Sequence, residues 1–272
     1  MPVMTEPIAN ARMYSATPAL KEDWKRLLAW ILRRADLHWP ILDYDAPAPL
    51  SHLWARNDLG SVFMCGLPFS HRLPSAMVVA APIPSPARYG GRPVYFTDIV
   101  VRADSAARSV EETFGGVAGY TVADSLSGAV AFAQHLQPYR EAAGRPLYRA
   151  VVGELIHARG VIGALCEGRI DVGPLDSYYH DLLRLADPDL AARVRVVATT
   201  QARPCPLFVA SAPLEPATLS RLRAAFAAVA AAQDLAGIRE SLQLRGFAFP
   251  DPSEYDVLRT LPRVLERPLE SF

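Results

Sequence analysis

The chain has 272 residues, of which 51% are hydrophobic and 21% charged, as in a soluble globular protein with room for two lobes. Its 28 Lys and Arg residues balance its 28 Asp and Glu residues, so the formal net charge is zero. This balance excludes the broad positive surface with which proteins bind nucleic acid or anionic membranes, and any anion site must be made locally by a few donors.

The sequence holds no apolar run of about 18 residues, so we expect no segment that inserts into a membrane. Residues 1–7 lack the basic stretch followed by an apolar stretch that marks a secretory signal peptide. The sequence as it stands therefore predicts a cytoplasmic protein, and a periplasmic one if a signal has been removed. No apolar stripe stands out, and we expect a monomer.

The three cysteines, Cys65, Cys166 and Cys205, are widely spaced and form no C-x-x-C pair. Neither a disulfide framework nor a zinc site is expected from them. The six histidines are scattered without the spacing of metal ligands, so we expect no metal and no cofactor. Cys65 follows an apolar run, but no base can be assigned beside it, which favours a structural role over a nucleophile.

The first half of the chain alternates short apolar runs with helical patterns. A strand is predicted over residues 8–13, followed by a helix from Pro18 to about residue 34, because apolar residues recur there at i, i+3, i+4 and i+7. The next predicted elements are a helix at 50–56, strands at 61–64, 77–81 and 93–102, a helix at 109–114 and a strand at 119–122, with loops at 40–49 and 82–92.

The second half continues the alternation. It predicts a helix after Ser127, strands at 147–152, 170–172 and 194–199, helices at 155–167 and 177–185, and helical structure from residue 208 onward, including 216–232, 234–242 and 252–261. Because strands alternate with helices throughout, we predict mostly parallel sheets with helices on both faces.

Two long β runs, at about 97–101 and 196–201, bracket a self-contained block of strands and helices. This pattern predicts a discontinuous first lobe of residues 1–98 and 200–272, with residues 99–199 inserted as a second lobe. Two crossover strands would act as hinges, and a ligand cleft would lie between the lobes.

The most informative segment is residues 122–128, where a short apolar run ends and a helix begins. The first N–H groups of a helix have no intrahelical partner and lie at the positive end of its dipole. Ser125 and Ser127 add hydroxyl donors, and Gly128 allows an anion to approach the backbone closely. A simple helix cap explains the same residues, because serine and aspartate are preferred there.

Several segments resemble a known family in the right order. They are residues 10–14 (NARMY), 64–68 (MCGLP), 95–105 (YFTDIVVRADS), 124–128 (DSLSG), 167–177 (EGRIDVGPLDS), and 245–247 (RGF) with Tyr255 and Asp256. Together they resemble the periplasmic substrate-binding proteins of phosphonate, phosphite and phosphate ABC transporters, which have the type 2 periplasmic-binding fold. The resemblance covers most of the chain.

The resemblance implies a two-lobed α/β protein that binds a small anionic ligand reversibly, closes by a hinge, has an ABC transporter permease as partner and is not an enzyme. Ser125 and Ser127 would hold an oxyanion, and Asp176 would accept a hydrogen bond from a protonated anion or a ligand amine. The remaining site residues that it implies are Tyr14, Tyr95, Thr97, Leu126, Gly128 and His157.

The sequence departs from the family pattern at two places. Leu126 stands where the family has a hydroxyl residue, and residues 153–157 (GELIH) replace a Gly-Ser-His or Gly-Gly-His turn, with Glu154 placed where it would repel a dianion. His157 is equally well explained as a ligand donor or as a helix cap. A cytoplasmic enzyme or a ligand sensor that reuses this fold remains an alternative, although the serines lack a Gly-x-Ser-x-Gly elbow.

Overall fold

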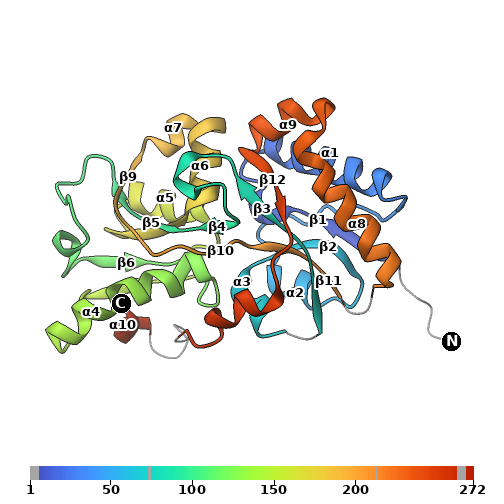
Figure 1. Cartoon of the computed structure of the whole chain (residues 1–272). Helices are drawn as coiled ribbons and strands as arrows, with labels where there is room; N and C mark the ends of the chain where they lie inside the picture. The colour runs from blue at the N-terminus through green and yellow to red at the C-terminus, as the bar shows by residue number, and fades with distance from the viewer. Residues whose placement is uncertain (1–5, 73–74, 212–213, 262–267) are drawn as a thin grey trace. The chain divides into compact units, whose positions relative to one another are not determined.

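A computed structural model describes residues 6–72, 75–211, 214–261 and 268–272 (Figure 1). The chain divides into two compact units. The first comprises residues up to Val94 and those from Pro204 to Arg259, and the second comprises Tyr95 to Arg203 with the residues from Thr260 onward. The lobe limits expected from the sequence stay a prediction, and residues 1–5, where no signal peptide is predicted, lie outside the described residues.

The first unit contains a five-stranded sheet with the order β1-β2-β11-β3-β12. β1 and β2 run parallel, whereas β11 is antiparallel to both of its neighbours and β12 is antiparallel to β3. The strands are β1 (Ile8–Asn10), β2 (Leu59–Met64), β3 (Ala76–Pro84), β11 (Leu207–Ser211) and β12 (Leu244–Ala248).

The predicted helix 18–34 is confirmed as α1 (Pro18–Arg34). Thr17 caps it by accepting a hydrogen bond from the N–H of Leu20 at 3.2 Å, and Pro18 occupies the first turn, where no N–H is needed. α1 contacts α8 (Pro216–Ala228) and α9 (Ala236–Ser241). The other helices of this unit are α2 (Leu50–Trp54), α3 (Gly66–Ser70) and the 3-10 helix Pro252–Leu258.

Aromatic rings from α1, β2 and β11 form the core of the first unit. Phe63 and Phe208 stack with ring centroids 3.8 Å apart, and Trp24 meets Phe63 edge-on at 5.1 Å. All three side chains are almost completely buried. Because aromatic pairs in these geometries add to the energy of burial, this cluster holds β11 beside β2 and under α1.

The second unit is built on a three-stranded sheet with the order β8-β5-β9, in which β5 is antiparallel to both neighbours. A parallel pair, β6 and β7, lies beside it. Its strands are β5 (Thr97–Arg102), β6 (Val117–Gly119), β7 (Ala150–Val152), β8 (Gly173–Asp176) and β9 (Val194–Thr199). Its helices are α4 (Ala131–Ala143), α5 (Ala158–Cys166), α6 (Ser177–Ala186), α7 (Pro188–Ala191) and α10 (Pro268–Ser271).

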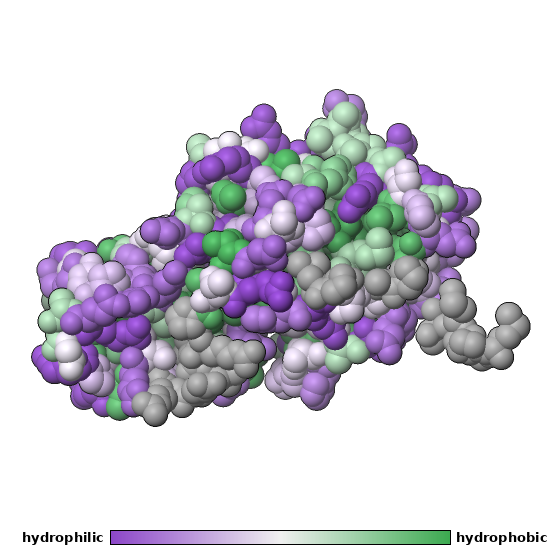
Figure 2. All heavy atoms as spheres, turned by 60° about the horizontal axis from the view of Figure 1, so that its bottom comes forward, coloured by the Kyte–Doolittle hydropathy of each residue, from purple (hydrophilic) through white to green (hydrophobic). Residues whose placement is uncertain are grey.

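The chain passes between the units at two short strands that pair with each other, β4 (Val94–Tyr95) and β10 (Arg203–Pro204). Hydrophobic and hydrophilic residues are mixed over most of the face shown in Figure 2. Among the described residues, the large apolar side chains that are exposed are Ile156, Leu185, Phe249, Val257 and Leu269.

The prediction of mostly parallel sheets is wrong, because the sheets are mixed and largely antiparallel. Helical structure from residue 208 onward is also wrong at two places, since β11 and β12 both come from that region. A short apolar run does not distinguish a strand from a helix, and alternation along the chain does not reveal that a late strand inserts between two early ones. The predicted strand 170–172 lies just before β8.

Candidate functional site

Residues 125–128 begin the longest helix of the second unit. Ser125 is extended (φ −79°, ψ 126°), and its Oγ accepts a hydrogen bond from the N–H of Gly128 at 3.1 Å. The helix opens with a π-helical turn, Leu126–Val130, and continues without a break into α4. The predicted helix start with a serine cap is therefore confirmed. Single π-helical turns are rare and recur at functional sites.

This helix start leaves donors for an anion. Within the described part of the chain, nothing accepts a hydrogen bond from the N–H of Leu126 or of Ser127. Both groups precede the first intrahelical bond and lie at the positive end of the helix dipole. The Ser125 hydroxyl oxygen accepts from Gly128, so its O–H group can still donate one hydrogen bond. We call residues 125–128 the anion socket.

Gly128 is required by packing within the anion socket. A Cβ at this position would lie 1.8 Å from Oγ1 of Thr121 and 2.9 Å from Oγ of Ser125. The N–H of Thr121 also donates to the carbonyl of Gly128 at 3.0 Å. The structure thus adds a reason that the sequence pattern did not reveal: glycine lets the Thr121 side chain close against the helix start.

A carboxylate faces the anion socket. The hydroxyl of Ser127 donates to Oδ2 of Asp176 at 3.3 Å, although the two residues lie 49 positions apart. Asp176 caps α6, and its Oδ1 accepts from the N–H groups of Tyr178 and Tyr179 at 2.9 and 3.1 Å. Asp176 is half-buried and Ser127 is buried. The structure therefore brings together two residues that the resemblance assigned to one ligand.

Thr97 holds the socket from β5. Its Oγ1 donates to the carbonyl of Ser127 at 3.1 Å, and its side chain is buried. Its N–H donates to Oγ1 of Thr200 at 3.0 Å, and the N–H of Thr200 returns a bond to the carbonyl of Thr97. Thr97 thus supports the anion socket through the backbone of Ser127, and a direct contact from Thr97 to a ligand stays a prediction.

The two predicted tyrosines lie in different places. Tyr95 is buried in β4, two residues before Thr97. Tyr14 belongs to the first unit, where it is buried and its ring meets Phe63 edge-on at 5.3 Å. A ligand contact from either tyrosine stays a prediction.

His157 caps α5. Its Nδ1 accepts a hydrogen bond from the N–H of Gly160 at 3.1 Å, so this nitrogen carries no proton in the capped state. Of the two roles left open by the sequence, the cap is observed. A contact from the same imidazole to a ligand stays a prediction.

The loop before His157 is strained. Glu154 and Ile156 both have positive φ, at 54° and 68°, which costs non-glycine residues about 1–3 kcal/mol each. The N–H groups of Leu155 and Ile156 tie the loop to the carbonyls of Tyr120 and Thr121. Burial, and secondarily the charge of Glu154, raise the pKa of Tyr120. The carboxylate of Glu154 therefore lies near the segment that leads into the anion socket.

The electrostatics of the predicted second-unit residues are unusual for an anion site. They include no lysine or arginine, and Asp176 adds a negative charge opposite Ser127. Repulsion between the Asp176 carboxylate and a ligand held by Ser127 would disfavour a doubly charged anion. A ligand that carries a proton, or a positive group beside its oxyanion, satisfies both the donors and the carboxylate.

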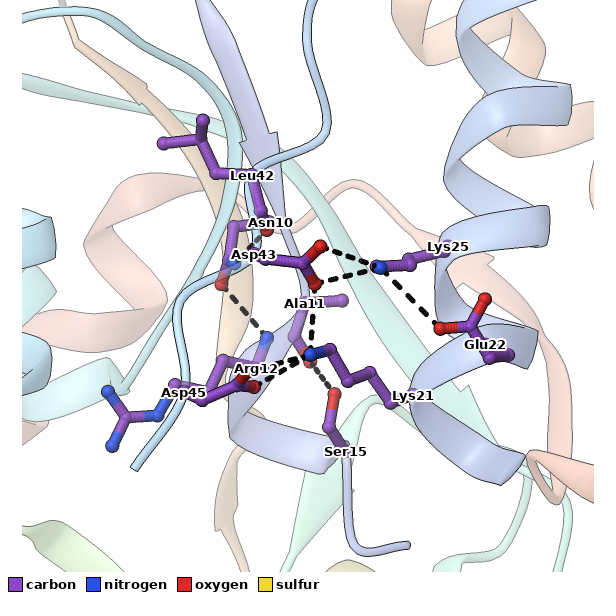
Figure 3. A network of polar contacts seen from close by, with 10 residues as sticks. All are labelled: Asn10, Ala11, Arg12, Ser15, Lys21, Glu22, Lys25, Leu42, Asp43 and Asp45. Carbon is purple, nitrogen blue, oxygen red and sulfur yellow. Dashed lines mark hydrogen bonds and ion pairs between the residues drawn. The ribbon is translucent and has the colours of Figure 1, made fainter. Parts of the chain in front are cut away.

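A polar pocket that the sequence did not predict lies in the first unit, and Figure 3 shows the polar contacts beside it. Lys21 bonds to Asp43 and Asp45 at 2.9 and 2.8 Å, and Lys25 bonds to Asp43 at 2.7 Å. Lys25, and then Lys21, lower the pKa of Asp43. Because the chain's own carboxylates already neutralise these lysines, the pocket offers little excess positive charge to an anion. The sequence pattern does not reveal these ion pairs, because the lysines of α1 and the aspartates of the following loop are 18 to 24 residues apart.

Among the described residues, no group of three or more His, Cys, Asp or Glu side chains is arranged to hold a metal ion. The three cysteines are not bonded to one another, and two of them are buried. None of the described helices is both long and apolar enough to cross a membrane.

Known structures share this fold. A binding protein component of an ABC phosphonate transporter from Pseudomonas aeruginosa matches with a TM-score of 0.74 and 16% identity, over 92% of this chain and 83% of that one. PhnD1 from Prochlorococcus marinus, in complex with methylphosphonate, matches with a TM-score of 0.73 and 14% identity, over 93% and 95%. A Xanthomonas citri protein bound to ATP matches with a TM-score of 0.63 and 20% identity, over 93% and 94%.

The family model for the periplasmic substrate-binding protein of the phosphonate ABC transporter matches residues 17–255. The chain belongs to this family. The resemblance drawn from the ordered sequence segments is confirmed, and with it the α/β periplasmic-binding-protein fold. Phosphonate substrate-binding proteins serve transport and are typically not enzymes. No curated protein sequence matches the chain.

Replacing Gly128 with Ala should destabilise the second unit, because the new methyl group collides with Thr121. We expect a loss of about 1–3 kcal/mol in the free energy of unfolding, measured by denaturant titration. Gly163→Ala is the matched control, since it lies in α5 with nothing within 4 Å of its Cβ position, and helix propensity makes it neutral or stabilising. Equal stability of the two variants would contradict the packing role.

Proposed function

We propose that the protein reversibly binds a small oxyanion of the phosphonate or phosphate type, as the solute-binding component of an ABC transporter whose permease is its partner. The observation that carries this proposal is the contact between Ser127 and Asp176 beside the open N–H groups of the anion socket. Donors for an oxyanion and an acceptor for its proton, 49 positions apart in the sequence, thus meet in the second unit.

The ligand form that suits this arrangement is singly protonated. The N–H groups of Leu126 and Ser127 and the hydroxyl of Ser125 would donate to the ionised oxygens, and Asp176 would accept from the P–OH group. A charge-assisted hydrogen bond of this kind is about twice as strong as a neutral one. A fully ionised phosphonate would instead place a second negative charge against Asp176.

Membership of the phosphonate substrate-binding family supports the choice of a phosphorus oxyanion. Two of the similar structures were solved with phosphorus-containing ligands, methylphosphonate and ATP, which guides the choice of probes. Leu126 is buried and its side chain has no hydroxyl, so the only donor that it could give the ligand is its backbone N–H. The backbone therefore carries a larger share of the binding than it would with a third hydroxyl.

A panel of small anions tests the proposal. Phosphate, phosphite and methylphosphonate should raise the unfolding temperature near neutral pH, whereas sulfate and methanesulfonate, which have no acidic proton there, should not. A ligand at about 100 times its dissociation constant stabilises the folded state by roughly 2.7 kcal/mol, which a thermal-shift measurement detects readily. Equal stabilisation by sulfonates and phosphonates, or none by either, would refute the proposed ligand class.

Removing the hydroxyl of Ser127 should weaken binding without unfolding the protein. Ser127→Ala deletes the charge-assisted hydrogen bond to Asp176, the carboxylate that would accept from the ligand, and we expect calorimetry with the strongest phosphorus anion of the panel to show a loss of about 1.5–3 kcal/mol. Asp124→Ala, at an exposed position three residues earlier, is the control and should keep its affinity. An unchanged affinity in Ser127→Ala would place the ligand elsewhere.

Ligand binding should also make the protein more compact, because we propose that the two units close on the ligand through the crossings at β4 and β10. Small-angle X-ray scattering with a saturating phosphorus anion should give a smaller radius of gyration than without it. Superimposable scattering profiles for the two states would contradict closure while leaving binding to be judged by calorimetry.

A further inference from the structure

The second unit contains a completely buried polar pair, His180 and Asp98. The Nδ1–H of His180 donates to Oδ2 of Asp98 at 2.9 Å, and the two side chains are 1% and 0% exposed. The Thr199 hydroxyl donates to Oδ1 of the same carboxylate at 3.2 Å. The pair joins α6, which carries His180, to β5, which carries Asp98.

The pair fastens the first turns of α6 to β5. One attachment is a two-way bond in which the Phe96 N–H donates to Oγ of Ser177 at 2.9 Å and the Ser177 N–H donates to the carbonyl of Phe96 at 3.0 Å. The second attachment is the bond from His180 to Asp98. Because positions i and i+3 share one face of a helix, the two attachments hold the same face of α6 against the strand.

The capping residue of α6 is the carboxylate that faces the anion socket. Asp176 comes directly before Ser177, and its Oδ1 is held by the first N–H groups of α6. The backbone of Asp176 pairs with Thr97 in the β8–β5 ladder, so a rotation or slide of α6 would turn the Asp176 side chain relative to Ser127 while its backbone stays in the sheet. The Ser127 side of this contact is fixed to the same strand through Thr97.

We infer that His180 is a positioning residue that sets the distance between Asp176 and the anion socket and so determines which anions the protein selects. A buried, hydrogen-bonded polar pair contributes little net stability compared with well-packed apolar residues, because desolvation offsets the attraction, but it restricts geometry. The inference rests on the proposed function for its selectivity readout, and its other readout needs no ligand.

Three variants of the full chain test the inference. His180→Leu keeps apolar volume but removes the donor, whereas His180→Asn keeps an N–H donor near the position of Nδ1. The matched control is Thr113→Val, which breaks another buried hydrogen bond of the same unit, between Thr113 and Tyr148 at 2.9 Å. If His180→Leu does not fold, His180→Gln, which moves the polar group away from Asp98, replaces it in both measurements.

The first measurement is hydrogen exchange at the N–H groups of Tyr178 and Tyr179, which donate hydrogen bonds to Asp176. We expect exchange to be about tenfold faster in His180→Leu than in the Thr113→Val control at equal residual stability. The His180→Asn variant should stay within about threefold of the parent protein. Equal exchange in His180→Leu and Thr113→Val would overturn the inference, because the pair would then act only through stability.

The second measurement is the ratio of the affinities for methylphosphonate and methanesulfonate. His180→Leu should lower this ratio by about tenfold, while Thr113→Val leaves it unchanged. A parent-like ratio in His180→Leu would overturn the role in selectivity. Failure of the parent protein to prefer methylphosphonate would refute the proposed function instead, and the exchange measurement would still decide whether His180 positions α6.

Discussion

Three consecutive residues of the chain, Phe96, Thr97 and Asp98, hold both sides of the candidate site. Successive side chains of a strand point to opposite faces, so Thr97 reaches the carbonyl of Ser127 while Asp98 reaches His180. The backbone of Phe96 bonds Ser177 at the start of α6. The separation of Ser127 from Asp176, and with it the chemistry of the site, depends on this short stretch. The stretch begins at the second residue of the second unit, directly after Tyr95.

A neutral protein without a lysine or arginine among its predicted second-unit site residues would bind the proposed anion by local means. Helix N–H groups and hydroxyls supply partial positive charge, which is sufficient for one negative charge and insufficient for two beside a carboxylate. The lysines that do exist near a pocket, in the first unit, are already paired with aspartates. The zero net charge disfavours nucleic acid as a partner. The scarcity of positive side chains beside Asp176 favours a protonated oxyanion as the proposed ligand.

The local parts of this site were predictable from the sequence. A helix start with Ser125 as its cap follows from residue preferences, and the ordered segments identified the family. What the sequence hid was long-range pairing. The insertion of β11 between β2 and β3 joins residues that no periodicity connects. The resemblance assigned Ser127 and Asp176 to one ligand, but the sequence pattern did not reveal their direct contact. The spacing of His180 gives no sign of its contact with Asp98 of β5, on which the role proposed for it rests.

Proton uptake on binding tests the central claim most directly. Calorimetry of methylphosphonate binding, repeated in buffers of different ionisation enthalpy at a pH where the free ligand is doubly ionised, gives the number of protons taken up. The account predicts about one proton per ligand in the parent protein, because Asp176 needs a P–OH partner, and clearly fewer in Asp176→Asn. Binding without proton uptake in the parent protein would show that a dianion occupies the site and would contradict the account.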